Sequence, residues 1–427
     1  MSSRAPTAIV GRKLQSLDGL RAVAIILVFL HHIEIYIPAV NQPIRVAGMY
    51  IAQGWMGVDL FFVLSGFLIT GILLDTREAN NYFAAFYARR ILRIFPLYYV
   101  VLTVVILLGS WLNSPRVAAT LPLPQDRWLY YCYLANWIGL WKGQWGGVNY
   151  LAHFWSLAVE EQFYLFWPLV IWLVRPRSIP WVAGTVAVAA AVMRFAWVTQ
   201  GGGERAVAFA TTSRLDELSI GALCAFLFRD AERMARIRKY LPRIAGFGIG
   251  SFLLAVSGML FFPERAGLLM YGSSPVQHTV EDATLFFADC GGYSLLALGF
   301  GALVLLAADT ERDHTRMQKF LKSRWLAPIG TYSYGIYVFH VPIIGAAALF
   351  VLPGLVKSLR TEAEVVFAAC SYIIGLATVT FVISALSYEF FEKRILRLKR
   401  YFEATYAPAQ DEAAPDGPAV AQEAIGS

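Results

Sequence analysis

The sequence predicts an all-α polytopic membrane protein with about ten transmembrane helices. Hydrophobic residues make up 58% of its 427 positions and charged residues 15%, whereas soluble domains carry roughly 25% charged residues. Aromatic residues reach 15% and gather near the ends of apolar stretches, as they do at membrane interfaces. This composition excludes an ordinary soluble enzyme. The net charge of +7 is therefore expected to orient the chain in a lipid bilayer, and no nucleic-acid partner is expected.

Apolar stretches long enough to cross a bilayer as helices recur along the whole chain. They lie near 20–39, 55–75, 93–112, 152–174, 179–199, 212–228, 243–262, 283–308, 332–352 and 364–388. No small-residue cleavage site follows the first stretch, so we expect it to be a true span and not a removed signal peptide. The aromatic segment 128–141 is short and is predicted to be interfacial or re-entrant.

The placement of Lys and Arg predicts the orientation of these spans. One set of connections, with both chain ends, holds 26 of these residues, and the alternate connections hold 8. By the positive-inside rule both termini are cytoplasmic, which requires an even number of spans. We therefore divide the chain into a cytoplasmic N-terminal segment (1–19), a transmembrane domain (20–395) and a cytoplasmic tail (396–427). The tail is rich in Ala, Pro, Glu and Asp and is predicted to be disordered.

The first span contains two ionisable residues, Arg21 and His32, that are eleven positions apart. On an α-helix this step places them on nearly one face, roughly 16 Å apart along the axis. An ionisable residue inside a span is costly and is usually kept for function, so His32 is predicted to be catalytic. Arg21 lies at the cytoplasmic edge, where it can bind a ligand or act as a snorkelling anchor. His31 points about 100° away and is the weaker candidate.

The fourth span carries a polar stripe. His153, Ser156, Glu160 and Tyr164 follow one another in steps of three, four and four, which places them on one helix face. Glu160 and its neighbour Glu161 are both catalytic candidates, because two glutamates in one span are hard to explain by folding alone.

Glu160 is expected to face inward, since Glu161 lies beside Leu157 and Leu165 on the helix surface. The alternative is an ion pair between a glutamate and Arg194 or Arg214 inside the bundle.

Arg90 and Arg93 precede the third span and are three residues apart, so they share a helix face. The guanidinium fork binds phosphate through charge-assisted hydrogen bonds. Basic residues at a cytoplasmic helix start also follow from topology alone. We predict that these two arginines, with Arg21, bind the phosphates of a donor.

Further polar residues lie within the apolar spans. In the second span, Ser65 and Gly66 are expected to permit close helix packing, and Asp59 is expected either to cap the span or to bind substrate. Arg214 and Asp216 are expected to pair with each other. The residues assigned to substrate binding are Asp59, Ser65, His153, Tyr164 and His340. The four cysteines are far apart and suggest neither a metal site nor a disulfide framework.

Taken together, these segments resemble the acyltransferase 3 family of integral membrane acyltransferases. The matching motifs are, in chain order, Arg21 with His32, the stretch 57–66, Arg90 with Arg93, the stretch 155–164, and Tyr337 with His340 and Pro342. The resemblance covers roughly residues 14–395, which is nearly all of the membrane part.

The resemblance implies transfer of an acyl group, usually acetyl, from cytoplasmic acetyl-CoA. It implies a bacterial cytoplasmic membrane protein with no permanently bound cofactor. The acceptor it implies is a hydroxyl of an extracytoplasmic carbohydrate, such as a surface polysaccharide, lipopolysaccharide or exopolysaccharide. An alternative acceptor is a secondary metabolite such as a macrolide sugar. Some members carry a fused esterase-like domain; this chain is expected to be the stand-alone form.

These expectations combine into one mechanism. His32 would act as a general base on the acceptor hydroxyl or carry the acyl group as a nucleophile. Glu160 would orient the imidazole or stabilise its charged form. The competing class is a proton-coupled secondary transporter, in which intramembrane His and Glu relay protons. Against that class, the sequence has no detectable inverted repeat and no matching pair of broken spans.

Overall fold

The computed structural model describes residues 14–34, 48, 50–112, 114–138, 150–200, 207–259, 291–312, 314–358 and 361–406. All regular structure in these ranges is helical. The long helices are α1 (Gln15–Glu34), α3 (Met56–Asp75), α4 (Tyr82–Trp111), α8 (Phe154–Leu173), α9 (Ile179–Thr199), α11 (Thr211–Phe228), α13 (Leu241–Met259), α16 (Tyr293–Ala308), α19 (Ser333–Phe350) and α21 (Glu362–Ser387).

Each of the ten apolar stretches overlaps one of these long helices, so the predicted helical fold class is confirmed. Within the described ranges, six helical stretches are long and apolar enough to cross a membrane. They include α1, α3, α4, α9, α19 and α21. The count of ten spans and the cytoplasmic side of the termini stay predictions.

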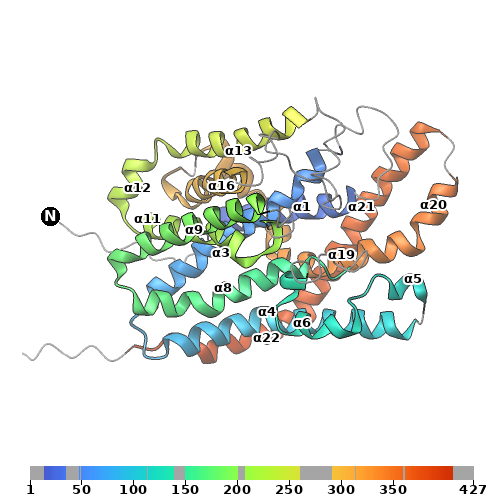
Figure 1. The fold of residues 1–427 in the computed structure, drawn as a ribbon, viewed down its shortest axis with the longest axis horizontal. Helices are drawn as coiled ribbons and strands as arrows, with labels where there is room; N and C mark the ends of the chain where they lie inside the picture. The colour runs from blue at the N-terminus through green and yellow to red at the C-terminus, as the bar shows by residue number, and fades with distance from the viewer. Residues whose placement is uncertain are drawn as a thin grey trace, which may run out of the picture.

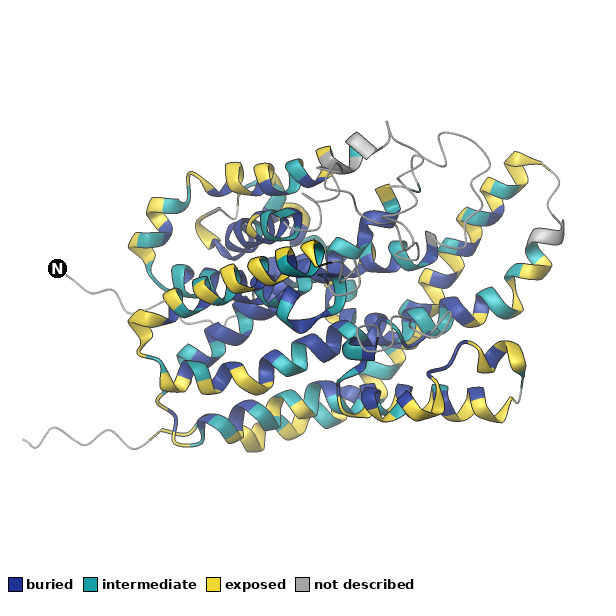
Figure 2. Cartoon of the chain, in the orientation of Figure 1, coloured by how far each residue is buried: buried dark blue, intermediate teal, exposed yellow. Residues whose placement is uncertain are grey.

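Helix α3 lies at the centre of the bundle. It packs against α11 on one side and against α8 on another, while α13 and α16 run along the face opposite α4 (Figure 1). Most of its residues are buried, whereas α4 and α9 each expose one face (Figure 2). The exposed side chains of these outer helices are largely apolar, for example Leu107 and Val188. Outward apolar side chains are expected where the solvent is hydrocarbon.

The contact between α3 and α11 requires glycine. A Cβ on Gly66 would lie 1.9 Å from the carbonyl oxygen of Leu218, and a Cβ on Gly221 would lie 2.2 Å from that of Val63. Small residues let helix backbones approach this closely. The predicted packing role of Gly66 is confirmed. Ser65 differs, because its hydroxyl hydrogen-bonds the hydroxyl of Tyr164 on α8.

Helix α4 begins at Tyr82, well before the predicted start at residue 93. Arg89, Arg90 and Arg93 therefore lie inside a helix, with Pro96 one turn further on. The apolar pattern alone misses this start, because the first turns of α4 mix aromatic and basic residues. In this part α4 packs against other helices of the protein and does not face lipid on all sides.

Beyond α21 the chain continues in helical form and lies beside α4. The short helix α22 (Lys393–Leu396) and the 3₁₀ turns Arg397–Phe402 both contact α4 (Figure 1). The Asn81 amide donates to the carbonyl of Glu403 at 2.7 Å and accepts from the N–H of Thr405 at 2.9 Å. The part of the tail up to residue 406 is thus fastened to the turn before α4, and 407–427 lie outside the described residues.

The aromatic segment 128–141 contains only short helical pieces where it is described. These are α6 (Arg127–Tyr131) and the 3₁₀ turn Ala135–Trp137. The hydroxyl of Tyr98 on α4 donates to the carbonyl of Tyr130 at 2.7 Å. The segment therefore packs against α4 and does not form a span of its own, while residues 139–141 lie outside the described ranges.

Candidate active-site cavity and histidine cluster

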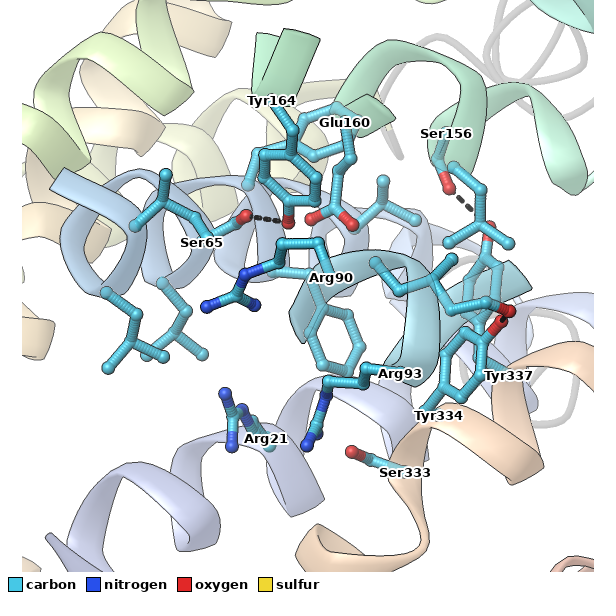
Figure 3. A pocket seen from close by; sticks show the side chains of 18 residues that line it. Arg21, Ser65, Arg90, Arg93, Ser156, Glu160, Tyr164, Ser333, Tyr334 and Tyr337 are labelled. Atoms are coloured by element: carbon cyan, nitrogen blue, oxygen red, sulfur yellow. Dashed lines mark hydrogen bonds between the residues drawn. The ribbon is translucent and has the colours of Figure 1, made fainter. Parts of the chain in front are cut away.

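A cavity opens between α1, α3, α4, α8 and α19 (Figure 3). About 820 Å³ of space lies between these helices, counting the open solvent at its mouth. The polar side chains that line it are Arg21, Ser65, Arg90, Arg93, Ser156, Glu160, Tyr164, Ser333, Tyr334 and Tyr337. The cavity thus brings together residues that the sequence places on five separate helices.

Three arginines form one side of this cavity. Arg21 comes from α1, and Arg90 and Arg93 come from successive turns of α4, with all three guanidinium groups on the same side of the cavity (Figure 3). Arg21 pairs with Asp18 at 3.2 Å. Within the described residues, neither Arg90 nor Arg93 forms a salt bridge with a carboxylate. The three cations therefore create a site that is suited to an anionic ligand.

The carboxyl group of Glu160 faces these arginines from α8. It contacts the hydroxyls of Ser65 and Tyr164 and lies near Arg90 (Figure 3). The ring of Tyr164 in turn lies 5.9 Å from the guanidinium carbon of Arg90. Glu161 is not among the residues that line the cavity, as its helical position predicts. Glu160 is thus the glutamate that a ligand in the cavity would meet.

A cluster of three histidines, His32, His153 and His340, lies beyond the other side of the cavity. The ring centroids of His32 and His340 are 4.8 Å apart, those of His153 and His340 are 5.1 Å apart, and those of His32 and His153 are 6.4 Å apart. They come from α1, the residue before α8, and α19. His153 and His340 are buried, and His32 is half-buried. No group of His, Cys, Asp and Glu with metal-site geometry occurs among the described residues.

Ser156 and Tyr337 connect the cavity to this histidine cluster. Both line the cavity, and the hydroxyl of Tyr337 donates to the carbonyl of His153 at 2.6 Å. The ring of Tyr337 lies 5.4 Å from that of His153 and 5.5 Å from that of His340. From the sequence alone, we assign no role to Ser156 or Tyr337. The signals for them are their helical steps from Glu160 and His340 and their places in motifs that carry the family resemblance.

The predicted contact between Glu160 and His32 is not formed. Among the described residues, Glu160 contacts Ser65, Tyr164 and Arg90, whereas His32 contacts Val28 and His340. Glu160 belongs to the arginine side of the cavity, and His32 belongs to the histidine side. The helix step explains this, because Ser156 is one turn closer to the histidines than Glu160 is.

Asp59 lies in a second, separate group of buried charges. It pairs with Arg214, which also contacts Glu217 at 3.2 Å. Arg194 pairs with Asp216 at 2.6 Å. The alternative pairing of Glu160 with Arg194 or Arg214 is therefore wrong, and so is the expected pairing of Arg214 with Asp216.

Three aromatic rings surround the side chain of Arg214. The distance from its guanidinium carbon to the ring centroid is 4.5 Å for Tyr293, 5.6 Å for Phe62 and 5.8 Å for Trp155. Asp59 is completely buried against this guanidinium and does not line the cavity. The ion pair of Asp59 with Arg214 thus lies inside the protein, and substrate binding by Asp59 stays a prediction.

Comparison with known proteins identifies the family of this chain. A family model described as an acyltransferase domain matches residues 14–389. The chain belongs to the acyltransferase 3 family. The matched range 14–389 includes the three cavity arginines, Glu160 and all three clustered histidines. No solved structure matches the chain.

The chain is similar to several curated O-acetyltransferases. It is 30% identical over 345 residues to peptidoglycan O-acetyltransferase OatA of Listeria monocytogenes, covering 77% of this chain and 49% of the relative. It is 29% identical over 348 residues to O-acetyltransferase OatA of Staphylococcus aureus, covering 78% and 51%. A putative O-acetyltransferase of Staphylococcus aureus is 27% identical over 384 residues, covering 84% and 56%. The chain thus spans about half the length of these relatives.

Proposed function

We propose that the protein is a multi-pass O-acyltransferase of the bacterial cytoplasmic membrane. It transfers an acyl group, in the first instance acetyl, from cytoplasmic acyl-CoA to a hydroxyl of an extracytoplasmic carbohydrate. One observation carries this proposal: a single cavity has three arginines on one side, and Ser156 and Tyr337 on its other side adjoin the histidine cluster, which itself does not line the cavity. In this proposal the chain has ten spans and both ends lie in the cytoplasm.

The arginine side suits the donor. Coenzyme A carries several phosphates on one end and its thioester on a long flexible arm. Arg21, Arg90 and Arg93 would bind the phosphates at the basic, cytoplasmic side. The apolar side chains that also line the cavity, which include Phe61 and Leu68, would cover the arm and exclude water from the thioester.

The histidine side suits the chemistry. His32 would take the proton of the acceptor hydroxyl, whose oxygen then forms a bond to the thioester carbonyl carbon. The carbon–sulfur bond breaks, and the proton passes from His32 to the departing sulfur, so that free coenzyme A leaves as its thiol. Glu160 would act on the donor side, where it balances part of the charge of Arg90 and contacts two hydroxyls that face the cavity.

A carbohydrate acceptor is supported by the relatives. The Listeria protein is named for peptidoglycan, so soluble peptidoglycan fragments are the first acceptor to try. A sugar on a secondary metabolite is the second acceptor class that the same chemistry would serve.

The decisive experiment uses the full chain in detergent with radiolabelled acetyl-CoA and soluble peptidoglycan fragments. We expect base-labile acetyl esters on the glycan from the wild-type protein. We expect none from His32→Ala, although this variant should bind acetyl-CoA as the wild type does. Proton-coupled solute flux in proteoliposomes without any acetylated product would overturn the proposal in favour of a transporter. Full acetylation by His32→Ala would overturn the role of His32.

A further inference from the structure

We infer that His340 is a positioning residue for His32. It holds the His32 imidazole in the tautomer that carries its proton on Nδ1, which leaves Nε2 as the base. This inference rests on the acyl transfer proposed above and assigns to a second histidine the orienting task that the sequence had suggested for Glu160. Three steps of geometry lead to it.

The first step fixes the proton of His340. Its Nδ1 lies 2.6 Å from the carbonyl oxygen of Tyr337 and 3.1 Å from that of Ile336. A carbonyl oxygen can only accept a hydrogen bond, so the Nδ1 between them must carry a proton. In the neutral imidazole the other nitrogen, Nε2, is then unprotonated and can only accept.

The unprotonated Nε2 of His340 in turn helps to fix the position of the proton on His32. The Nε2 of His340 lies 3.3 Å from the Nδ1 of His32, and the carbonyl oxygen of Val28 lies 2.8 Å from the same Nδ1. Both neighbours of the His32 Nδ1 are therefore acceptors, which places a proton on that nitrogen. The Nε2 of neutral His32 keeps the lone pair that a general base needs.

The third step concerns access. His340 is completely buried, whereas His32 is half-buried. The two rings meet edge to face, with an angle of 83° between their planes, so His340 also restricts the plane of the His32 ring. A buried ring that fixes a more accessible one has the same arrangement as the carboxylate behind the histidine of a serine-protease triad. Here a neutral imidazole takes the place of the carboxylate.

Besides the carbonyl of Val28, which accepts from the His32 Nδ1 at 2.8 Å, the neighbours of the pair supply no further acceptor to this nitrogen among the described residues. His31 lies on the other side of His32, with ring centroids 5.0 Å apart, and its own Nδ1 lies 2.5 Å from the carbonyl oxygen of Ala52. His153 faces His340, and no contact joins its ring nitrogens to the His32 nitrogens among the described residues. His340 is thus the side chain that contacts the His32 Nδ1.

Two variants separate positioning from packing. His340→Gln keeps an amide oxygen that can accept from the His32 Nδ1, and His340→Phe keeps the ring volume but has no acceptor. Both are assayed for acetyl transfer with acetyl-CoA and peptidoglycan fragments, as full-length protein in detergent. We expect His340→Phe to lower kcat by about 100-fold, within the range that a positioned acid–base group supplies. The KM of His340→Phe for acetyl-CoA should stay unchanged. The kcat of His340→Gln should be at least tenfold higher than that of His340→Phe.

A spectroscopic measurement tests the same inference without any turnover. The chain has six histidines, so ¹⁵N-histidine labelling gives few signals, and those of His32 are identified by their loss in His32→Gln. We expect the Nδ1–H tautomer for His32 in the wild-type protein and in His340→Gln. In His340→Phe only one of the two described acceptors, the carbonyl of Val28, remains, and we expect a larger fraction of the Nε2–H tautomer than in the wild type. An Nε2–H tautomer of His32 in the wild type would overturn the inference, even if the Phe variant fails to fold. So would equal kcat losses in the Phe and Gln variants. If the wild type transfers no acetyl group but shows the Nδ1–H tautomer, the proposed function fails and the positioning stands.

Discussion

The side-chain oxygens of Ser156 and Tyr337 lie 2.5 Å apart. Because Tyr337 donates its one proton to the carbonyl of His153, the hydroxyl of Ser156 is the donor to Tyr337. The contact joins α8 to α19 where the cavity meets the histidine cluster. A ligand that extends from the arginines toward the histidines must pass these two hydroxyls.

Tyr337→Phe should lower kcat for acetyl transfer by about tenfold and leave the KM for acetyl-CoA nearly unchanged. The substitution removes the acceptor of the Ser156 hydroxyl and the closest donor to the carbonyl of His153, which leaves these two groups with their longer contact to each other at 3.5 Å. Loss of a buried hydrogen-bond partner costs about 1–3 kcal/mol. Tyr334→Phe is the matched control, because Tyr334 also lines the cavity but donates to the carbonyl of Ile94 at 2.6 Å, on the α4 side. Equal kcat losses in the two variants would contradict a specific role for Tyr337.

Arg90→Ala and Arg93→Ala should each raise the KM for acetyl-CoA by about tenfold or more, since a hydrogen bond to a charged group contributes about 1.5–3 kcal/mol. Added salt should weaken donor binding by the wild type in the same direction. Arg89→Ala serves as the control, because Arg89 lies in the same helical turn but is exposed and outside the cavity. The phosphate-binding role is wrong if Arg89→Ala raises KM as strongly as the other two.

Glu160→Gln keeps the shape of the side chain but removes its charge and one acceptor. Because Glu160 contacts Ser65 and Tyr164 and lies near Arg90, we expect kcat to fall by about 100-fold, as for a positioned acid–base group. Glu161→Gln should change kcat far less, since Glu161 does not line the cavity. Steady-state kinetics with acetyl-CoA measure both, and a larger loss in the Glu161 variant would reverse the assignment.

Gly66→Ala should lower the thermal unfolding midpoint of the protein in detergent. The added Cβ would lie 1.9 Å from the carbonyl oxygen of Leu218, so α3 and α11 must move apart. Gly184→Ala in α9 is the control, because a Cβ there meets nothing within 4 Å and alanine favours a helix by about 0.5–1 kcal/mol. A midpoint for Gly66→Ala at or above that of Gly184→Ala would disprove the close contact.

Asp59→Asn should destabilise the protein while leaving the KM for the acceptor unchanged. Removal of one partner from a buried ion pair typically costs about 3–5 kcal/mol, and Arg214 would keep only Glu217 as a carboxylate partner. Thermal unfolding and acceptor kinetics, measured well below the unfolding midpoint, separate the two effects. An increased acceptor KM at unchanged stability would instead favour the predicted substrate-binding role of Asp59.

The sequence predicts the helices of this protein well because each consists of a long apolar stretch with its own boundaries. It fails at the start of α4, where basic and aromatic residues precede the apolar part and the helix is held by its neighbours. The inward face of α8 also follows from the sequence, since helical steps place His153, Ser156, Glu160 and Tyr164 together and separate Glu161 from them.

Helical steps in the sequence do not predict which side chains of distant helices contact each other. His32 and His340 are 308 positions apart, and nothing in either span specifies that these two rings meet. The same holds for Arg214, for which the sequence offers Asp216 close by, whereas the fold supplies Asp59 from another helix. In both cases the packing of the helices determines which of several chemically similar acceptors forms the contact.

The amide of Asn81 holds the backbone of residues 403 and 405, and Asn81 directly precedes the helix that carries Arg90 and Arg93. The last described stretch of the chain is therefore hydrogen-bonded to the beginning of the helix that carries the proposed donor site. Separation of residues 403–405 from Asn81 would remove this anchor at the beginning of α4. The acyl-CoA binding that we propose would thus depend on contacts that lie outside the cavity.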